Sequence, residues 1–196
     1  MNIYIERLKD ALDKVEITSG RATRMTYTNG INELVEVFRT YKNSRRGVYL
    51  CGNGGSAGIA QHMTADYLKN GGIFTHSLYG QTTLTCLSND LSYEYVFSKQ
   101  LELMAKEKEL LVALSSSGES ENIIRAIRTI RKFNGIVITL TGFKENNRIR
   151  GTGDWNIYVP VEHYGIVESI HNIILQQIVD EIVAVDGVAL KLEKDL

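Results

Sequence analysis

Residues 51–58 read Cys51-Gly52-Asn53-Gly54-Gly55-Ser56-Ala57-Gly58. An apolar run at 47–51 precedes them, and apolar side chains at helical spacing follow over 56–69. The glycines allow the backbone to turn tightly and to approach a ligand, and the first turn of a helix offers unpaired N–H groups. This stretch predicts a strand–turn–helix unit that can hold an anion, with the Ser56 hydroxyl as a further donor.

Three interpretations fit such a turn. It can be an ordinary strand-to-helix connection. It also fits the loose form of the dinucleotide fingerprint, Gly52-x-Gly54-x-x-Ala57, but that motif needs an acidic residue after the next strand. The next strand here ends His76-Ser77-Leu78-Tyr79-Gly80, without an acid. No Gly-Lys-Ser/Thr follows the glycines, which excludes a P-loop, so we favour a phosphate site without a nucleotide.

A second polar stretch, Ser115-Ser116-Ser117-Gly118-Glu119-Ser120-Glu121-Asn122, follows an apolar run and opens a predicted helix. Serines at a helix start often serve only as caps. Four serines around a glycine exceed what one cap needs, so we expect a second anion-binding loop at the same edge of the sheet. Glu119 and Glu121 would repel a phosphate if they faced it.

Strands and helices alternate from residue 47 onward. We expect strands at 47–51, 74–79, 110–115, 135–141 and 155–159, and helices at 56–69, 81–88, 93–105, 120–133 and 164–185. The runs at 110–115 and 135–141 are continuously apolar, which suits strands that are buried on both faces. The pattern is typical of a doubly wound α/β domain with a parallel sheet flanked by helices.

Two further helices, over about 2–18 and 30–43, are predicted before the first strand. Since they lie outside the alternation, their apolar faces, like that of 164–185, are expected to pack against other subunits. We expect the chain to form one domain, with N-terminal helices over 1–46 and an α/β core over 47–186.

The composition narrows the classes of partner that we expect for the protein. The chain has 196 residues, of which 43% are hydrophobic and 23% charged, with a net charge of −1. This balance gives no reason to expect nucleic acid or a membrane as partner. No segment resembles a signal peptide and no apolar run approaches 18 residues, so we expect a cytoplasmic protein. Cys51 and Cys86 are expected to be free thiols, although a disulfide between them stays open.

The two loops, together with three further pieces, resemble the sugar isomerase (SIS) domain family and its phosphoheptose isomerase branch. The further pieces are Ala60-Gln61-His62, Ser88-Asn89-Asp90 and Val137-Ile138-Thr139-Leu140-Thr141-Gly142, and the resemblance runs over about residues 5–185. It implies a five-stranded parallel sheet and a homotetramer with active sites at subunit interfaces. It also implies isomerisation of sedoheptulose 7-phosphate to a heptose 7-phosphate, without a nucleotide.

The resemblance also implies roles by position. Phosphate and substrate contacts fall on Ser56, Ser115, Ser116, Ser117 and Ser120. The residues implied to line the sugar are Asn53, Gly54, Gly55, Asn89 and Asp90, and Gln176 is counted with the substrate-binding residues because of its place on the last helix.

At several positions that carry the chemistry in the family, this sequence has a different residue type. Ile59 replaces an acid, Asp66 a glutamate, Glu168 a glutamine and Gln176 a histidine. Isomerisation needs an acid and a base, and a glutamine cannot supply a proton at neutral pH. We therefore expect Asp66 and Glu168 to carry the proton transfers, either as a close pair in which one pKa is raised or as ligands of a shared metal.

A metal site is one hypothesis for these residues. His62 and Asp66 lie four positions apart on one helix face and, with Glu168, give one histidine and two carboxylates that Zn or Mn would accept. His62 could instead only form a hydrogen bond across an interface. His171, three residues after Glu168, is either structural or part of the site.

The departures leave a second hypothesis from another class, a phosphosugar-binding or protein-binding member that has lost catalysis. A nucleotide-sugar or dinucleotide enzyme is disfavoured by the missing ribose acid.

Overall fold

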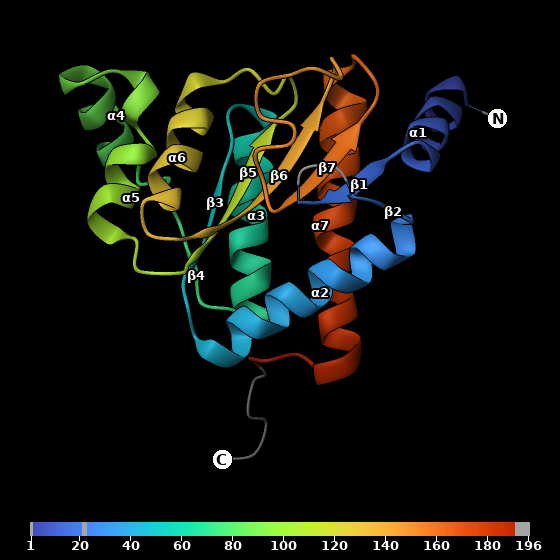
Figure 1. The fold of residues 1–196 in the computed structure, drawn as a ribbon, viewed down its shortest axis with the longest axis horizontal. Helices are drawn as coiled ribbons and strands as arrows, with labels where there is room; N and C mark the ends of the chain where they lie inside the picture. The colour runs from blue at the N-terminus through green and yellow to red at the C-terminus, as the bar shows by residue number, and fades with distance from the viewer. Residues whose placement is uncertain (1, 21–22, 191–196) are drawn as a thin grey trace.

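The computed structural model describes residues 2–20 and 23–190 (Figure 1). Its elements follow in the order α1 (Ile3–Asp13), β1 (Glu16–Ser19), β2 (Thr23–Met25), α2 (Tyr27–Ser44), β3 (Val48–Cys51), α3 (Gly55–Lys69), β4 (Thr75–His76), α4 (Gln81–Asp90), η1 (Tyr93–Tyr95), α5 (Ser98–Met104), β5 (Leu110–Ser115), α6 (Glu121–Arg131), β6 (Ile136–Gly142), β7 (Trp155–Val159) and α7 (Tyr164–Asp186). The predicted alternation of strands and helices is confirmed. The predicted strand at 74–79 shortens to β4, and the predicted helix at 93–105 divides into η1 and α5.

One sheet organises the chain, with strand order β2-β1-β7-β6-β5-β3-β4. The strands from β7 to β4 are parallel, whereas β1 runs antiparallel to β7 and β2 antiparallel to β1. The five predicted strands therefore form, but over residues 2–20 and 23–190 the predicted count of five is corrected to seven. The parallel part places β3 beside β5, so their carboxyl ends lie next to each other.

The added hairpin corrects the prediction of a helix over 2–18, because α1 ends at Asp13. Ile17 lies in the core with 1% exposure and pairs with Ile157 of β7. Arg150 also donates to Glu16 at 2.9 Å. Pairing with an otherwise open sheet edge and burial of a β-branched side chain favour a strand here over continued helix.

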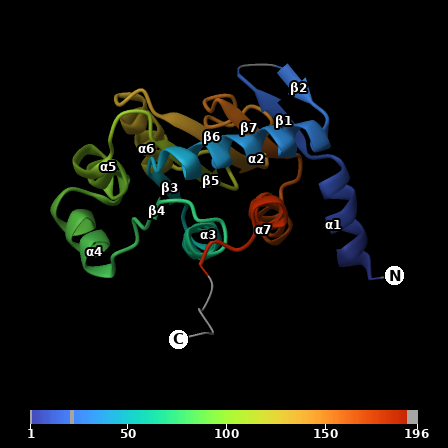
Figure 2. The ribbon, with the colours of Figure 1, turned by 90° about the horizontal axis from the view of Figure 1, so that it is seen from below.

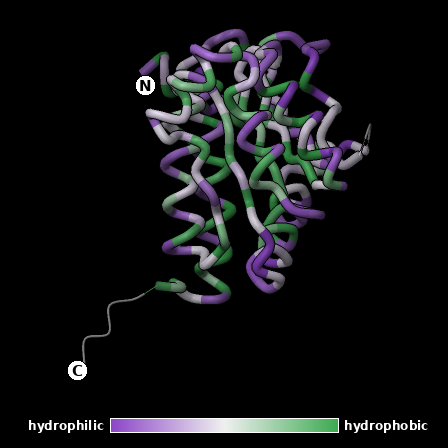
Figure 3. The backbone as a smooth tube through the Cα atoms, turned by 90° about the vertical axis from the view of Figure 1, so that its left-hand side faces the viewer, coloured by the Kyte–Doolittle hydropathy of each residue, from purple (hydrophilic) through white to green (hydrophobic). Residues whose placement is uncertain are grey.

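Helices cover the sheet in two layers (Figure 2). Residues of α2, α3 and α7 share one core cluster with one set of strand side chains. Residues of α5 and α6 share a second cluster with the other set. Hydrophilic and hydrophobic stretches alternate along the helices, as the tube in Figure 3 shows.

Burial within the chain corrects the expected role of two helices in an oligomer. The apolar face of α2, including Leu34 and Phe38, is buried in this chain's own core. The same holds for Ile170 and Ile174 of α7. These faces therefore need no partner subunit to cover them, while α1 exposes three large apolar side chains, Ile3, Tyr4 and Ile5.

Two further features of the structure concern a possible disulfide between the cysteines and helices that could cross a membrane. Cys51 is buried and Cys86 exposed, and both are free, so the two do not form a disulfide. Within residues 2–20 and 23–190, none of the helices is long and apolar enough to cross a membrane.

Candidate active site

The loop between β3 and α3, residues 52–54, is shaped by its glycines. Gly54 has φ of +54°, a conformation that a side chain would strain. A Cβ on Gly52 would lie 2.7 Å from the Ser56 Cβ. Gly54, which precedes α3, provides no side-chain cap; the Ala57 and Gly58 N–H groups bond to the Gly54 carbonyl, and the Ser56 N–H is directed at a carboxylate, that of Glu168. The loop is therefore built for close approach of an anion to the helix start.

The loop between β5 and α6 presents its serines differently from a capping motif. Ser120 precedes α6, but its side chain accepts no capping hydrogen bond. The Ser115 hydroxyl donates instead to the Ser120 hydroxyl at 3.2 Å. The Ser116 hydroxyl is buried and has no partner in the described part of the chain. Capping of α6 by Ser120 therefore does not account for this loop. Ser117 accepts from the Glu119 backbone N–H at 3.3 Å, and the hydroxyls of Ser116, Ser117 and Ser120 can still donate to a ligand.

Both acidic residues of the serine loop are held by a neighbouring segment. Glu119 accepts a hydrogen bond from the Arg148 backbone N–H at 3.1 Å. Glu121 accepts one from the Arg148 guanidinium at 2.9 Å, which lowers the pKa of that carboxyl. Neither glutamate lines the cavity described below. Both stand outside it and so need not repel a bound phosphate.

The two loops are joined by side-chain amides. Asn53 and Asn122 exchange two hydrogen bonds, each of 2.9 Å, and the Tyr93 hydroxyl donates to the Asn53 oxygen at 2.9 Å. Asn122 is buried with 3% exposure. This network fixes the distance between the two helix starts.

The loops enclose a cavity of about 380 Å³ at the carboxyl ends of β3 and β5. It is lined by Asn53, Gly54, Gly55, Ser56, Ser115, Ser116, Ser117, Ser120, Tyr164 and Glu168. Eight of these ten residues were predicted to bind substrate or phosphate, and Glu168 was predicted to be catalytic. Within the described residues of one chain, no arginine or lysine lines this cavity, so the groups that one chain offers to an anion here are hydroxyls, N–H groups and helix dipoles.

Glu168 is the only acidic residue among those that line the cavity. It comes from the second turn of α7 and faces Gly55, where an added Cβ would overlap its carboxylate. Burial raises the pKa of Glu168, and the Ser56 backbone N–H opposes this by favouring the ionised form. Within one chain the raised pKa of Glu168 thus arises from burial rather than from a second carboxylate.

Asp66 and His62 lie elsewhere on α3. Their side chains approach each other at 3.6 Å and are partly exposed. Tyr67, adjacent to Asp66, donates to the Leu175 carbonyl at 2.9 Å, so this end of α3 lies level with Leu175. Glu168 precedes Leu175 by two turns of α7, or about 10 Å. Asp66 and Glu168 therefore do not meet within one chain.

This separation bears on the predicted metal set of His62, Asp66 and Glu168. Over residues 2–20 and 23–190, no three His, Cys, Asp or Glu side chains are grouped so that they could hold a metal ion. The three donors do not fit one metal within this chain, because two lie on α3 and the third faces the cavity.

The remaining predicted residues lie outside the cavity lining. Gln176 donates to Asp180 at 2.9 Å on α7. Asn89 donates to Asp90 at 2.8 Å at the exposed end of α4. His171 is fully buried, where its Nε2 lies 3.1 Å from the Thr141 carbonyl oxygen and burial lowers its pKa to about 4. A neutral, enclosed His171 supports the structural interpretation.

Sequence reasoning missed two residues of this region. Tyr164 lines the cavity from the start of α7 and packs edge-on against Phe143, and no sequence pattern marked it. Asn122 lies in the serine stretch at 115–122, but its pairing with Asn53 depends on the juxtaposition of the two loops.

The match of a family model identifies the class of the protein. The SIS domain model matches residues 15–142, and the chain therefore belongs to the SIS domain family. A phosphoheptose isomerase from Edwardsiella ictaluri is 40% identical over 136 residues, which cover 67% of this chain and 69% of that protein. A similar protein from Proteus mirabilis is 40% identical over 131 residues, 64% of this chain and 67% of its own. Within the family, the chain falls in the phosphoheptose isomerase branch.

Solved structures agree with this placement. The phosphoheptose isomerase GmhA from Neisseria gonorrhoeae superposes with a TM-score of 0.77 at 25% identity, covering 92% of this chain and 95% of that one. The sugar isomerase domain of an RpiR transcription factor from Sphaerobacter thermophilus has a TM-score of 0.59 at 19% identity, over 93% and 86% of the two chains. The second likeness concerns the fold alone.

Proposed function

We propose that this chain is a phosphoheptose isomerase that converts sedoheptulose 7-phosphate to a heptose 7-phosphate. One observation carries the proposal. The serine-bearing loops that follow β3 and β5, here called the serine loops, line one cavity together with Glu168 at the adjacent ends of these strands. The similarity to phosphoheptose isomerases over two thirds of the chain supports the choice of substrate.

In this proposal the serine loops hold the phosphate. The hydroxyls come from Ser56, Ser115, Ser116, Ser117 and Ser120, and the dipoles of α3 and α6 favour the anion at their starts. Asn53, tied to Asn122, lies where it can bind a sugar hydroxyl. Binding at the phosphate end places the carbonyl end of the sugar toward Glu168.

Glu168 carries the proton in this scheme. The reaction removes a proton from C1 of the ketose and returns one to C2, while a second proton moves between the two oxygens. A carboxyl whose pKa is raised by burial is a stronger base than an ordinary glutamate and accepts and returns a proton more readily near neutral pH. The acid–base chemistry proposed for the cavity of one chain therefore rests on this residue.

We further propose a homotetramer in which a neighbouring copy completes the site. Within one chain Asp66, adjacent to Tyr67, lies level with Leu175 rather than with Glu168. If Asp66 takes part in proton transfer, it must reach the cavity from another subunit. Co-expression of Glu168→Gln and Asp66→Asn chains then restores activity in mixed oligomers, whereas either variant alone stays impaired.

The proposal is tested by assaying purified protein with a panel of ketose phosphates, with and without divalent metal and with a chelator. We expect turnover of sedoheptulose 7-phosphate above that of shorter ketose phosphates. Loss of turnover on chelation would indicate a metal held between subunits, since the donors of one chain do not gather.

A second candidate is a binding protein without catalysis. It is favoured by Gln176, which pairs with Asp180 and offers no titratable group where the resemblance expects a histidine. Binding of the phosphosugar by calorimetry without any turnover would establish this function instead.

A further inference from the structure

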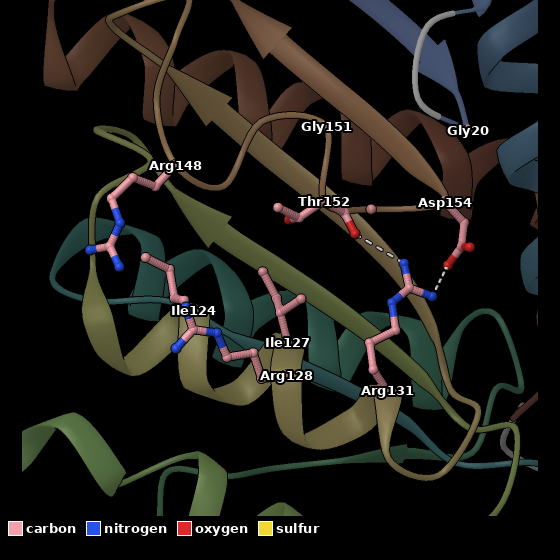
Figure 4. A pocket seen from close by; sticks show the side chains of 10 residues that line it. Gly20, Ile124, Ile127, Arg128, Arg131, Arg148, Gly151, Thr152 and Asp154 are labelled. Carbon is pink, nitrogen blue, oxygen red and sulfur yellow. Dashed lines mark hydrogen bonds and ion pairs between the residues drawn. The ribbon is translucent and has the colours of Figure 1, made fainter.

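A second cavity lies apart from the candidate active site, between α6 and the segment that leads into β7 (Figure 4). Its volume is about 780 Å³. It is lined by Gly20, Ile124, Ile127, Arg128, Arg131, Arg148, Gly151, Thr152, Gly153 and Asp154, and we name it the arginine cleft. None of these residues lines the cavity of the candidate active site, which we call the serine cavity.

The arginine cleft is positively charged. Three arginines and one carboxylate, Asp154, line it, and a second carboxylate, Glu121, lies outside the lining beside Arg148. Arg131 is fully engaged, because it donates to Asp154 at 2.6 Å and to the carbonyls of Gly135 and Thr152 at 3.0 Å. Arg148 donates to Glu121 at 2.9 Å. Excess positive charge in a concave site attracts anions.

Arg128 is the uncommitted cation of the cleft. Over residues 2–20 and 23–190 it forms no hydrogen bond or ion pair, and it is exposed. Figure 4 shows its side chain extending along α6 toward the end where Arg148 lies, and away from Arg131. One end of the cleft therefore presents a free guanidinium near a second, partly engaged one, an arrangement that suits a phosphate group.

An apolar floor adjoins this cationic end. Ile124 and Ile127 line the cleft, and Figure 4 shows the Ile127 side chain directed into its middle. A phosphate ion alone would fill little of the volume and would leave this floor unused. Arginine guanidinium groups also stack on planar rings. A ligand that matches the whole cleft combines an anionic group with a flat ring whose face can pack on apolar side chains.

We propose that the arginine cleft binds a nucleoside phosphate, with the phosphate on Arg128 and Arg148 and the base over Ile124 and Ile127. The site is separate from the glycine-rich loop. It adjoins the serine loop, because the Arg148 backbone N–H donates to Glu119 and the Ile149 N–H to the Gly118 carbonyl at 3.0 Å. A phosphate on Arg148 competes with Glu121 for that guanidinium.

The test uses AMP as the probe, with adenosine and inorganic phosphate as partial ligands, in calorimetry on the full-length protein. Isoleucine methyl NMR reports the place of binding. We expect AMP to bind at least tenfold more tightly than either partial ligand and to shift the Ile124 and Ile127 methyl signals. Arg128→Ala should weaken AMP binding about tenfold or more, since a charge-assisted hydrogen bond is lost.

Two controls separate this site from alternatives. Lys132→Ala removes a positive charge just past the C-terminal end of α6, outside the cleft lining, and should leave AMP affinity within about twofold. A Ser56→Ala, Ser117→Ala variant disables the serine cavity and should also leave AMP binding intact. The proposal is overturned if AMP fails to bind at about 5 mM, if Arg128→Ala and Lys132→Ala weaken it equally, or if binding is lost with the serines.

Discussion

Gly55→Ala tests the role of Glu168 without touching that residue. A Cβ at position 55 would lie 2.5 Å from the Glu168 Cδ, whereas ordinary contact begins at 3.4 Å. The carboxylate must therefore move by about 0.9 Å, the difference between these distances. Displacement of a reacting group by about 1 Å costs on the order of 100-fold in turnover. We expect kcat for sedoheptulose 7-phosphate to fall by about that factor.

Stability should change little in this variant. The group that must yield is the end of a flexible, half-buried side chain, and alanine is favoured over glycine in helices by up to about 1 kcal/mol. The melting temperature should then stay within about 3 °C of the wild type by calorimetry. Gly58→Ala is the matched control, because nothing lies within 4 Å of its added Cβ. If both variants retain similar turnover, Glu168 is not positioned for catalysis as we argue.

The site and its surroundings give three further predictions. Ser117→Ala should weaken phosphosugar binding by about 1–2 kcal/mol through loss of one hydrogen bond to a charged group, and an unchanged calorimetric affinity would remove Ser117 from the site. His171 has a pKa of about 4 in the fold against an ordinary histidine value of 6.5, so the unfolded chain binds the extra proton between these values. The free energy of unfolding should consequently fall by up to about 3 kcal/mol as pH drops from 6.5 to 4, a dependence that denaturant titration should find missing in His171→Gln. Light scattering at micromolar concentration should give a tetramer, and a monomer would refute the shared site.

Sequence predicted the parallel core and both loops because these features are local. Continuous apolar runs mark buried strands, and glycines with serines mark the turns that follow them. The hairpin of β1 and β2 was missed because Ile5, Leu8, Leu12 and Val15 keep helical spacing beyond the true end of α1. Pairing with β7 decides the structure of this segment, and the local sequence does not show that the edge of a distant strand will be available for pairing.

In the candidate site, too, local features could be predicted from the sequence, whereas the packing of distant elements could not. The serine loops meet because β3 and β5 are neighbours, which the doubly wound pattern already suggested. The spacing of His62 and Asp66 placed them on one helix face but did not reveal their level relative to Glu168. That level depends on how α3 packs against α7, which sequence spacing alone does not determine. Tyr164 escaped notice because an aromatic residue at a helix start carries no signature of its own.

Isomerisation of sedoheptulose 7-phosphate in D₂O, followed by NMR, tests the central claim most directly. If Glu168 exchanges its proton with solvent between removal from C1 and return to C2, the wild type should form the aldose with deuterium at C2. Glu168→Gln should lower the rate of both product formation and deuterium incorporation by at least tenfold. Absence of any aldose with the wild type, or an undiminished rate with Glu168→Gln, would contradict the account.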